Sequence, residues 1–300
     1  MKKLYSILII GLSLLLFTAC GNNNQKQKSE NKEPATNKVA ETKENKETKD
    51  KKVKVGIVGE SKEWDYVKKE AAKEGIDIEL VQFDSYTLPN AALDLGEIDL
   101  NSFQHVAYLN GEKEQLGYKI NPIGNTFIGP IAVYSKKIKS LEELKDGDTI
   151  VIPEDATNAG RTLNLLDKIG LIKVPEDAGY TPTLKDIENP RNFKILEFNS
   201  ANIKSALDEV ELVALYSGQA SDAGLRPIED SLAFDLNSAD DIKPDNPYIN
   251  VIVAREGEED NPTYKRIVEL YQSDEVIKLE KKETPVIFPA WGIGEKYGKN

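Results

Sequence analysis

The sequence predicts an α/β protein built as two lobes with a ligand cleft between them. Residues 53–58 and 76–81 alternate as strands on either side of a helix-periodic stretch, an order that favours a parallel sheet. A second strand–helix unit begins at Thr149. An apolar strand over residues 247–254 can then return the chain to the first sheet. A middle lobe inserted into an outer one by two crossings makes a hinged cleft.

The first twenty residues predict an export signal. Lys2 and Lys3 precede an apolar run over residues 4–17, which is too short for a stable membrane span, and Cys20 follows small residues. Cys20 is the only cysteine, so one chain cannot form a disulfide. Its position resembles the lipobox of bacterial lipoproteins, with Phe17 where leucine is usual, which implies a lipid on Cys20. Cleavage without lipidation and a retained helix are the alternatives.

Residues 21–52 predict a disordered tether. The segment is rich in Asn, Gln, Lys, Glu and Thr, and Val39 is its one β-branched aliphatic residue. Such a composition cannot bury enough apolar surface to offset the entropy of ordering. As a flexible coil it would reach roughly 30 Å, enough to hold a domain clear of a membrane.

Charge and residue counts exclude several classes of function. Removing the 11 basic and 6 acidic side chains of the first 52 residues from totals of 39 and 51 leaves 28 against 45, a net charge of −17. This surplus argues against nucleic acid as a partner. One histidine and one cysteine exclude multi-histidine and thiolate metal sites, and no glycine-rich nucleotide motif is present. We expect no metal and no cofactor.

Local signals place the remaining elements in order. Ser61 caps a helix that Gly75 ends, and Pro89 begins a short helix closed by Gly96. Further helices are predicted after a capping box at residues 140–143, after Thr157, after Thr183, at 203–207, after Asn261 and from about 274. Further strands are predicted at 98–100, 118–123, 127–134, 149–152, 193–198 and 210–216. We expect one lobe from residues 53–134 and 248–300, and the other from 135–247.

The first candidate wall of the cleft surrounds His105, the only histidine. Phe103, His105 and Tyr108 fall near the predicted start of a helix that follows a strand, where open α/β sheets place ligands. Tyr108 shares a helix face with His105, whereas Phe103 joins them only from the preceding turn. The alternative is that the two aromatic residues are core and His105 is a satisfied buried histidine.

The second candidate wall is the start of the helix after Thr157. Arg161 lies one turn into this helix, behind Asn158, with Gly160 allowing a close backbone approach, an arrangement that suits a carboxylate. The alternative is a surface arginine paired with Glu154 or Asp155.

Asn250 interrupts an otherwise apolar strand, and a buried amide needs partners, which favours a ligand role. Tyr86 and Tyr108 are ambiguous between pocket lining and core edge.

Several of these segments together resemble the methionine-binding lipoproteins of bacterial ABC importers, the NlpA/MetQ family. The shared motifs are Tyr86-Thr-Leu-Pro-Asn90, Gly96-Glu-Ile-Asp99, Phe103-Gln-His105 with Tyr108-Leu109, Tyr134-Ser135, Thr157-Asn-x-Gly-Arg161 and Tyr248-x-Asn250. The resemblance implies a periplasmic-binding-protein-like fold of type II. It also implies an amino-acid ligand, an ABC permease with its ATPase as partner, and a place on the outer face of the membrane.

The resemblance also implies the ligand contacts. Its arginine takes the carboxylate, its asparagine bonds the polar end and its aromatic residues enclose the side chain; the positions are Tyr86, Phe103, His105, Tyr108, Asn158, Arg161 and Asn250. Three departures stand out: Ser85 replaces an expected Asp, Gly129 replaces an expected Glu, and residues 216–220 replace a motif that carries a pocket asparagine.

Two classes of function follow. The first is a membrane-tethered receptor, with L-methionine leading and another amino acid or a methionine-containing dipeptide as alternatives. The second is an extracytoplasmic enzyme that uses His105 as an acid or base. No G-x-S-x-G motif accompanies the histidine, and we favour the receptor mainly because of the resemblance.

Overall fold

The first lobe is a five-stranded sheet with helices on both faces. The computed structural model describes residues 51–226, 229–236, 243–284 and 286–292. In this sheet the strand order is β2-β1-β3-β11-β4, and β11 runs antiparallel to both of its neighbours. The strands are β1 (Lys51–Val58), β2 (Ile76–Phe83), β3 (Leu100–His105), β4 (Ile120–Asn125) and β11 (Asn250–Arg255).

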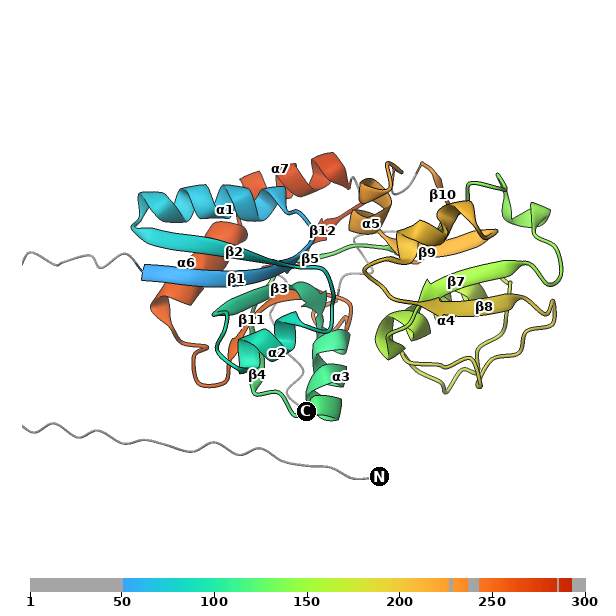
Figure 1. Cartoon of the computed structure of the whole chain (residues 1–300), viewed down its shortest axis with the longest axis horizontal. Coiled ribbons are helices and arrows are strands. Elements are labelled where there is room, and N and C mark those ends of the chain that lie inside the picture. The colour runs from blue at the N-terminus through green and yellow to red at the C-terminus, as the bar shows by residue number, and fades with distance from the viewer. Residues whose placement is uncertain (1–50, 227–228, 237–242, 285, 293–300) are drawn as a thin grey trace, which may run out of the picture. The chain divides into compact units, whose positions relative to one another are not determined.

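Two apolar cores cover the faces of this sheet (Figure 1). On one face Trp64, Val67 and Ala71 of helix α1 pack with residues of two C-terminal helices. On the other face two short helices contribute Leu93 and Leu109. The helices are α1 (Lys62–Lys73), α6 (Pro262–Tyr271) and α7 (Asp274–Glu283) on the first face, and α2 (Pro89–Asp94) and α3 (Val106–Leu116) on the second.

The second lobe repeats this layering around a sheet of order β10-β6-β9-β7-β8. Its strands are β6 (Ile131–Tyr134), β7 (Thr149–Pro153), β8 (Lys194–Phe198), β9 (Leu212–Tyr216) and β10 (Ser231–Phe234). Its helices are α4 (Ala156–Lys168), α5 (Ser217–Asp222) and the 3-10 helices η1 (Leu141–Glu143) and η2 (Ile203–Asp208). Leu163 and Leu166 of α4 pack on one face, and Ile203 and Leu207 of η2 on the other. The predicted two-lobed α/β fold is confirmed.

The first crossing between the lobes is held by residues 288–290, near the C-terminal end of the described chain. The first crossing contains β5 (Phe127–Ile128), which pairs with β12 (Phe288–Pro289). Asn125 also donates its side-chain amide to the carbonyl of Ala290 at 2.9 Å. The C-terminal segment therefore fixes the strand that leads from one lobe into the other.

The predicted boundary between the lobes requires correction. The expected first lobe extends to Tyr134, with residues 127–134 as one strand. Gly129 and Pro130 interrupt that strand, and Ile131–Tyr134 pairs with β9 and β10 of the second sheet. Proline has no N–H to donate to a ladder, so the break falls at this dipeptide and the crossing precedes β6.

Smaller expectations also changed. Lys51 and Lys52, predicted as tether, begin β1, and the rest of the tether and the export signal lie outside the described residues. Thr183 caps no helix; its N–H and hydroxyl bond the Asp186 carboxylate in a turn. The Ser140 capping box is not formed, because the Glu143 carboxylate accepts the N–H of Lys139 instead. Strand β10 and helix α5 were not predicted.

Gly160 offers a test of how the second lobe packs. A Cβ at this position would lie 2.6 Å from both the Thr181 Cα and the Tyr180 carbonyl oxygen. The close approach predicted here is therefore to residues 180–182 of the same lobe. Gly160→Ala should lower the free energy of unfolding by about 1–3 kcal/mol, as overpacking does, in a denaturant titration. Gly111→Ala is the control: its Cβ would meet Thr157 at an ordinary 3.7 Å, and alanine favours the helix. Equal stability of the two variants would contradict the packing argument.

Candidate functional site

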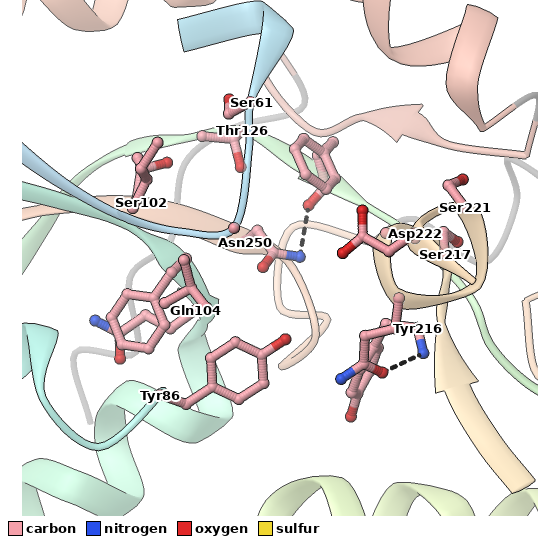
Figure 2. A pocket seen from close by; sticks show the side chains of 18 of the residues that line it. Ser61, Tyr86, Ser102, Gln104, Thr126, Tyr216, Ser217, Ser221, Asp222 and Asn250 are labelled. Atoms are coloured by element: carbon pink, nitrogen blue, oxygen red, sulfur yellow. Dashed lines mark hydrogen bonds between the residues drawn. The ribbon is translucent and has the colours of Figure 1, made fainter. Parts of the chain in front are cut away.

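A cavity of about 650 Å³ is lined by residues of both lobes, and all seven predicted ligand residues contribute to it. Figure 2 shows side chains from the first lobe, among them Tyr86 and Asn250, facing Tyr216, Ser217 and Asp222 of the second. A site that draws on both lobes can bind a ligand and close around it.

Three aromatic rings form the first wall. The ring of Phe103 lies 6.0 Å from that of Tyr86 and 5.9 Å from that of Tyr108, centroid to centroid. The Tyr108 hydroxyl donates to the carbonyl of Tyr86 at 3.1 Å, which holds the two tyrosines together. Phe103 lies in β3 rather than near the helix start, because the strand continues to His105 and α3 begins only at Val106. The wall is therefore built from a strand, a turn and a helix.

A buried amide network supports this wall from behind. Asn90 donates to Gln104 at 2.8 Å, Gln104 donates to Asn101 at 3.0 Å, and Asn101 donates back to Asn90 at 2.9 Å. All three residues are buried. Mutual pairing satisfies polar groups that would otherwise be costly to bury, and it fixes α2 against β3. The sequence analysis assigned no role to these amides.

His105 forms hydrogen bonds in both lobes and so links them. Its Nδ1 accepts the backbone N–H of Tyr108 at 3.1 Å and so caps α3. The proton must then lie on Nε2, which donates to the Asn158 side-chain oxygen of the other lobe at 2.8 Å. Burial, with a smaller effect of the Arg161 charge, lowers the pKa of His105 to about 4 despite the opposing bond from Asn158. The imidazole is therefore neutral near pH 7.

Asp155 organises the start of α4. Its carboxylate accepts the backbone N–H of Asn158 at 3.0 Å, the Asn158 side-chain amide at 3.0 Å and the Ser200 hydroxyl at 2.8 Å. Asp155, not Thr157, is thus the N-cap. The alternative pairing of Arg161 with Asp155 or Glu154 is not formed, and Glu154 bonds Asn199 instead.

Arg161 lines the cavity, with only 3% of its surface exposed. Its Nε donates to Asp235 at 2.6 Å and one Nη2 proton goes to the Gly129 carbonyl at 2.9 Å. The Tyr248 ring covers the guanidinium, with Cζ 4.3 Å from the ring centroid. Among the described residues, these bonds give partners to two of its five N–H groups, and Arg161 lines the cavity.

Asp235 and Tyr248 are not among the residues that line the cavity, but both contact the Arg161 guanidinium, and neither was assigned a role from the sequence. Asp235 also accepts the backbone N–H of Ile131 at 3.0 Å, so it is fixed before it meets Arg161. Asp235 follows β10, a strand that was not predicted, and for this reason the sequence did not indicate a role for it. Tyr248 belongs to a quoted motif, and its ring also lies 5.4 Å from the ring of His105.

Asn250 begins β11, where the chain re-enters the first sheet. Its side-chain amide donates to the Phe127 carbonyl of the first crossing at 3.3 Å, a long bond (Figure 2). The residue is half-buried and lines the cavity. A long bond to the crossing leaves Asn250 free to serve a ligand as well as the backbone.

Gln219, in the segment that departs from the family motif, does not restore the missing asparagine. Its carbonyl oxygen accepts the backbone N–H of Tyr216 at 3.0 Å and its amide donates to the carbonyl of Ser200. The side chain therefore caps α5, and the cavity receives the side chains of Tyr216 and Ser217 here.

Two α/β lobes, two crossings and a polar and aromatic cavity between them are the architecture of solute-binding proteins. The NlpA lipoprotein family model matches residues 53–291, and this chain belongs to that family. The D-methionine-binding lipoprotein MetQ of Salmonella typhimurium is 45% identical over 236 residues, covering 77% of this chain and 84% of that protein.

Solved structures agree with the family assignment. The crystal structure of the methionine-binding protein MetQ is 41% identical, with a TM-score of 0.75, covering 80% of this chain and 98% of that one. A nutrient-binding protein from Burkholderia cenocepacia bound to methionine is 38% identical, with a TM-score of 0.74, covering 80% and 100%. The resemblance stated from the motifs is thus confirmed.

The buried histidine generates a pH prediction. A histidine whose folded pKa lies below its unfolded value of about 6.5 contributes stability that is complete above pH 6.5 and is lost as the pH falls toward 4. Its contribution to the free energy of unfolding should decline by about 1.4 kcal/mol per pH unit within that window. Denaturant titrations of the wild type and His105→Gln at pH 7.5, 6.0 and 5.0 isolate the effect, since other groups titrate in both proteins. A constant difference across that range would contradict a neutral His105.

Proposed function

We propose that this protein is a membrane-anchored receptor that captures a small amino acid, with L-methionine leading, and delivers it to an ABC importer. The observation that carries the proposal is the buried Arg161 that lines an interlobe cavity with an aromatic wall. The arginine supplies fixed donors for a carboxylate, and aromatic rings make favourable contacts with a thioether. One relative is named a D-methionine-binding lipoprotein and a similar solved structure is described as bound to methionine, which supports methionine as the ligand.

The enzyme alternative finds no support in the site. His105 uses Nδ1 to cap α3 and Nε2 to bond Asn158, so neither nitrogen is directed at a reacting group. A pKa of about 4 also makes it a weak base at neutral pH. We infer that the protein binds its ligand and returns it unchanged.

The importer and the membrane complete the proposal. None of the helices in the described part of the chain is both long and apolar enough to cross a bilayer. Relatives at this level of identity are named lipoproteins, which supports the lipid on Cys20 as the anchor on the outer face. A permease with its ATPase is the partner implied by a receptor of this class.

The ligand is tested first by thermal shift. L-methionine that binds only the folded state at a hundredfold excess over its Kd stabilises the protein by about 2.7 kcal/mol, a rise in Tm of several degrees. Asn250→Ala should lower the affinity for methionine at least tenfold, so the thermal shift should be smaller than in the wild type. Its ligand-free Tm should stay near that of the wild type, because the hydrogen bond from the Asn250 side chain to the Phe127 carbonyl is long. Asn164→Ala, outside the cavity, is the matched control. No shift with methionine but a clear one with another amino acid would reject methionine.

The anchor is tested by fractionation. Cys20→Ser removes the proposed lipid site, and the protein should move from the membrane fraction to the soluble fraction or the medium, as an immunoblot of each fraction would show. Ser61→Ala, within the domain, should stay with the membrane. A variant without Cys20 that remains fully membrane-bound would refute the lipid anchor.

A further inference from the structure

Asp235 holds Arg161 from outside the cavity. Its carboxylate accepts the Arg161 Nε proton at 2.6 Å with one oxygen and the Ile131 backbone N–H at 3.0 Å with the other. Its own N–H donates to the Ile131 carbonyl at 3.1 Å, and its carbonyl accepts from the Lys168 ammonium at 2.9 Å. The side chain is 19% exposed and does not line the cavity. Asp235 can therefore act on a ligand in the cavity only by holding Arg161 and by its charge.

Arg161 is the buried cation of the cavity wall. Among the described residues that line the cavity, five carry a carboxyl group and three a basic group, the latter being Lys62, Arg161 and Lys204. Lys62 is exposed, Lys204 is half-buried and lies 3.4 Å from Asp222, and Arg161 is buried. His105 adds no charge at neutral pH, because burial lowers its pKa to about 4. A ligand carboxylate that is removed from water in this cavity thus has Arg161 as its counter-charge.

The charge of Arg161 is already balanced by a neighbour. Burial alone would lower the pKa of Arg161, but the charge and the hydrogen bond of Asp235 outweigh burial and the pKa is raised. The two side chains are therefore an ion pair without net charge. A ligand carboxylate on Arg161 adds a third charge and leaves one negative charge in excess. Because an uncompensated charge removed from water is costly, the ligand must bring a positive charge of its own.

We propose that Asp235 is a positioning residue that also determines specificity: it holds Arg161 and cancels its charge, so that the site binds zwitterions in preference to carboxylates without an ammonium group. This inference rests on the proposed function and deepens it, since it names the charge class of the ligand and the residue that selects that class. In Asp235→Asn the guanidinium has no counter-charge, and a simple anion gains affinity relative to a zwitterion.

Two ligands that differ only in the ammonium group test the proposal by isothermal titration calorimetry. L-methionine is the zwitterion, and 4-(methylthio)butanoate is an anion with the same side chain and carboxylate. The readout is the ratio of their two dissociation constants, because a purely structural change weakens both ligands alike. The wild type should bind L-methionine about a hundredfold or more tightly. Asp235→Asn should reduce this preference on the order of tenfold, as the loss of one nearby charge in a protein interior allows.

Two further variants separate charge from position. Asp235→Glu keeps the charge but displaces the carboxylate, so both ligands should weaken while the ratio stays within about twofold. Asp146→Asn removes the same charge from another arginine–aspartate pair of this lobe. Asp146 is 2.9 Å from the Arg191 Nε, its side chain is 75% exposed, and neither residue lines the cavity. Its affinities for both ligands should match those of the wild type, because an exposed pair is well screened.

Lys168→Gln keeps the proposal testable if Asp235→Asn does not fold, since a buried arginine without its partner is destabilising. Lys168 is exposed, and its ammonium bonds the backbone carbonyl of Asp235. Its loss leaves the Arg161–Asp235 pair intact but removes a positive charge beside it. The preference for L-methionine should therefore rise, by about two- to threefold at low ionic strength. If Asp235→Asn cannot be purified, an unchanged ratio in Lys168→Gln would overturn the proposal.

The remaining outcomes keep the two proposals apart. Equal weakening of both ligands in Asp235→Asn, or equal binding of both by the wild type, would overturn the specificity role and leave the amino-acid receptor standing. A similar loss of preference in Asp146→Asn would assign the effect to the charge of the whole lobe, which also overturns that role. If the wild type binds neither ligand, the proposed methionine-class function fails, and the specificity inference fails with it.

Discussion

The buried guanidinium of Arg161 is the group around which the rest of the structure must be arranged. A charge removed from water is costly unless it is paired and hydrogen-bonded, and here Asp235, the Gly129 carbonyl and the Tyr248 ring meet that requirement together. Gly129 belongs to the first crossing between the lobes. Asp235 and Tyr248 belong to the second crossing, which lies between β10 and β11. Both crossings therefore converge on one side chain, so the geometry of the hinge and that of the cavity depend on each other.

A second set of bonds joins the lobes through neutral groups. His105 bonds Asn158 across the cavity, and Asp155 holds Asn158 in place from the helix cap. Because the histidine is deprotonated, this joint adds no charge beside Arg161, where a cation would be repelled. The combination gives the lobes a specific contact of modest strength, which suits a receptor that exchanges its ligand.

Two of the three departures from the family motif, Gly129 and residues 216–220, lie beside each other: a Cβ at Gly129 would be 3.6 Å from the Ser217 hydroxyl oxygen. Gln219 is used to cap α5, so the lost asparagine is not replaced by another amide, and the hydroxyls of Tyr216 and Ser217 reach the cavity instead. Gly129 contributes its carbonyl to Arg161 where a longer side chain was expected. The carboxylate end of the site is thus kept while the chemistry beside it changes, and a family assignment alone does not determine the ligand.

The sequence by itself determined most of the elements and the family. Apolar periodicity and caps such as Ser61 depend on neighbours within a few residues, and the motifs around His105 and Arg161 carried the site residues with them. Only the tertiary structure decided which charged side chains form ion pairs. The pairing of Arg161 with Asp235 joins residues 74 positions apart and passes through a strand with too weak a pattern to predict. Equally, the lobe boundary depended on which sheet residues 131–134 join, because an apolar strand of that length can pair in either sheet and only the register with β9 selects one.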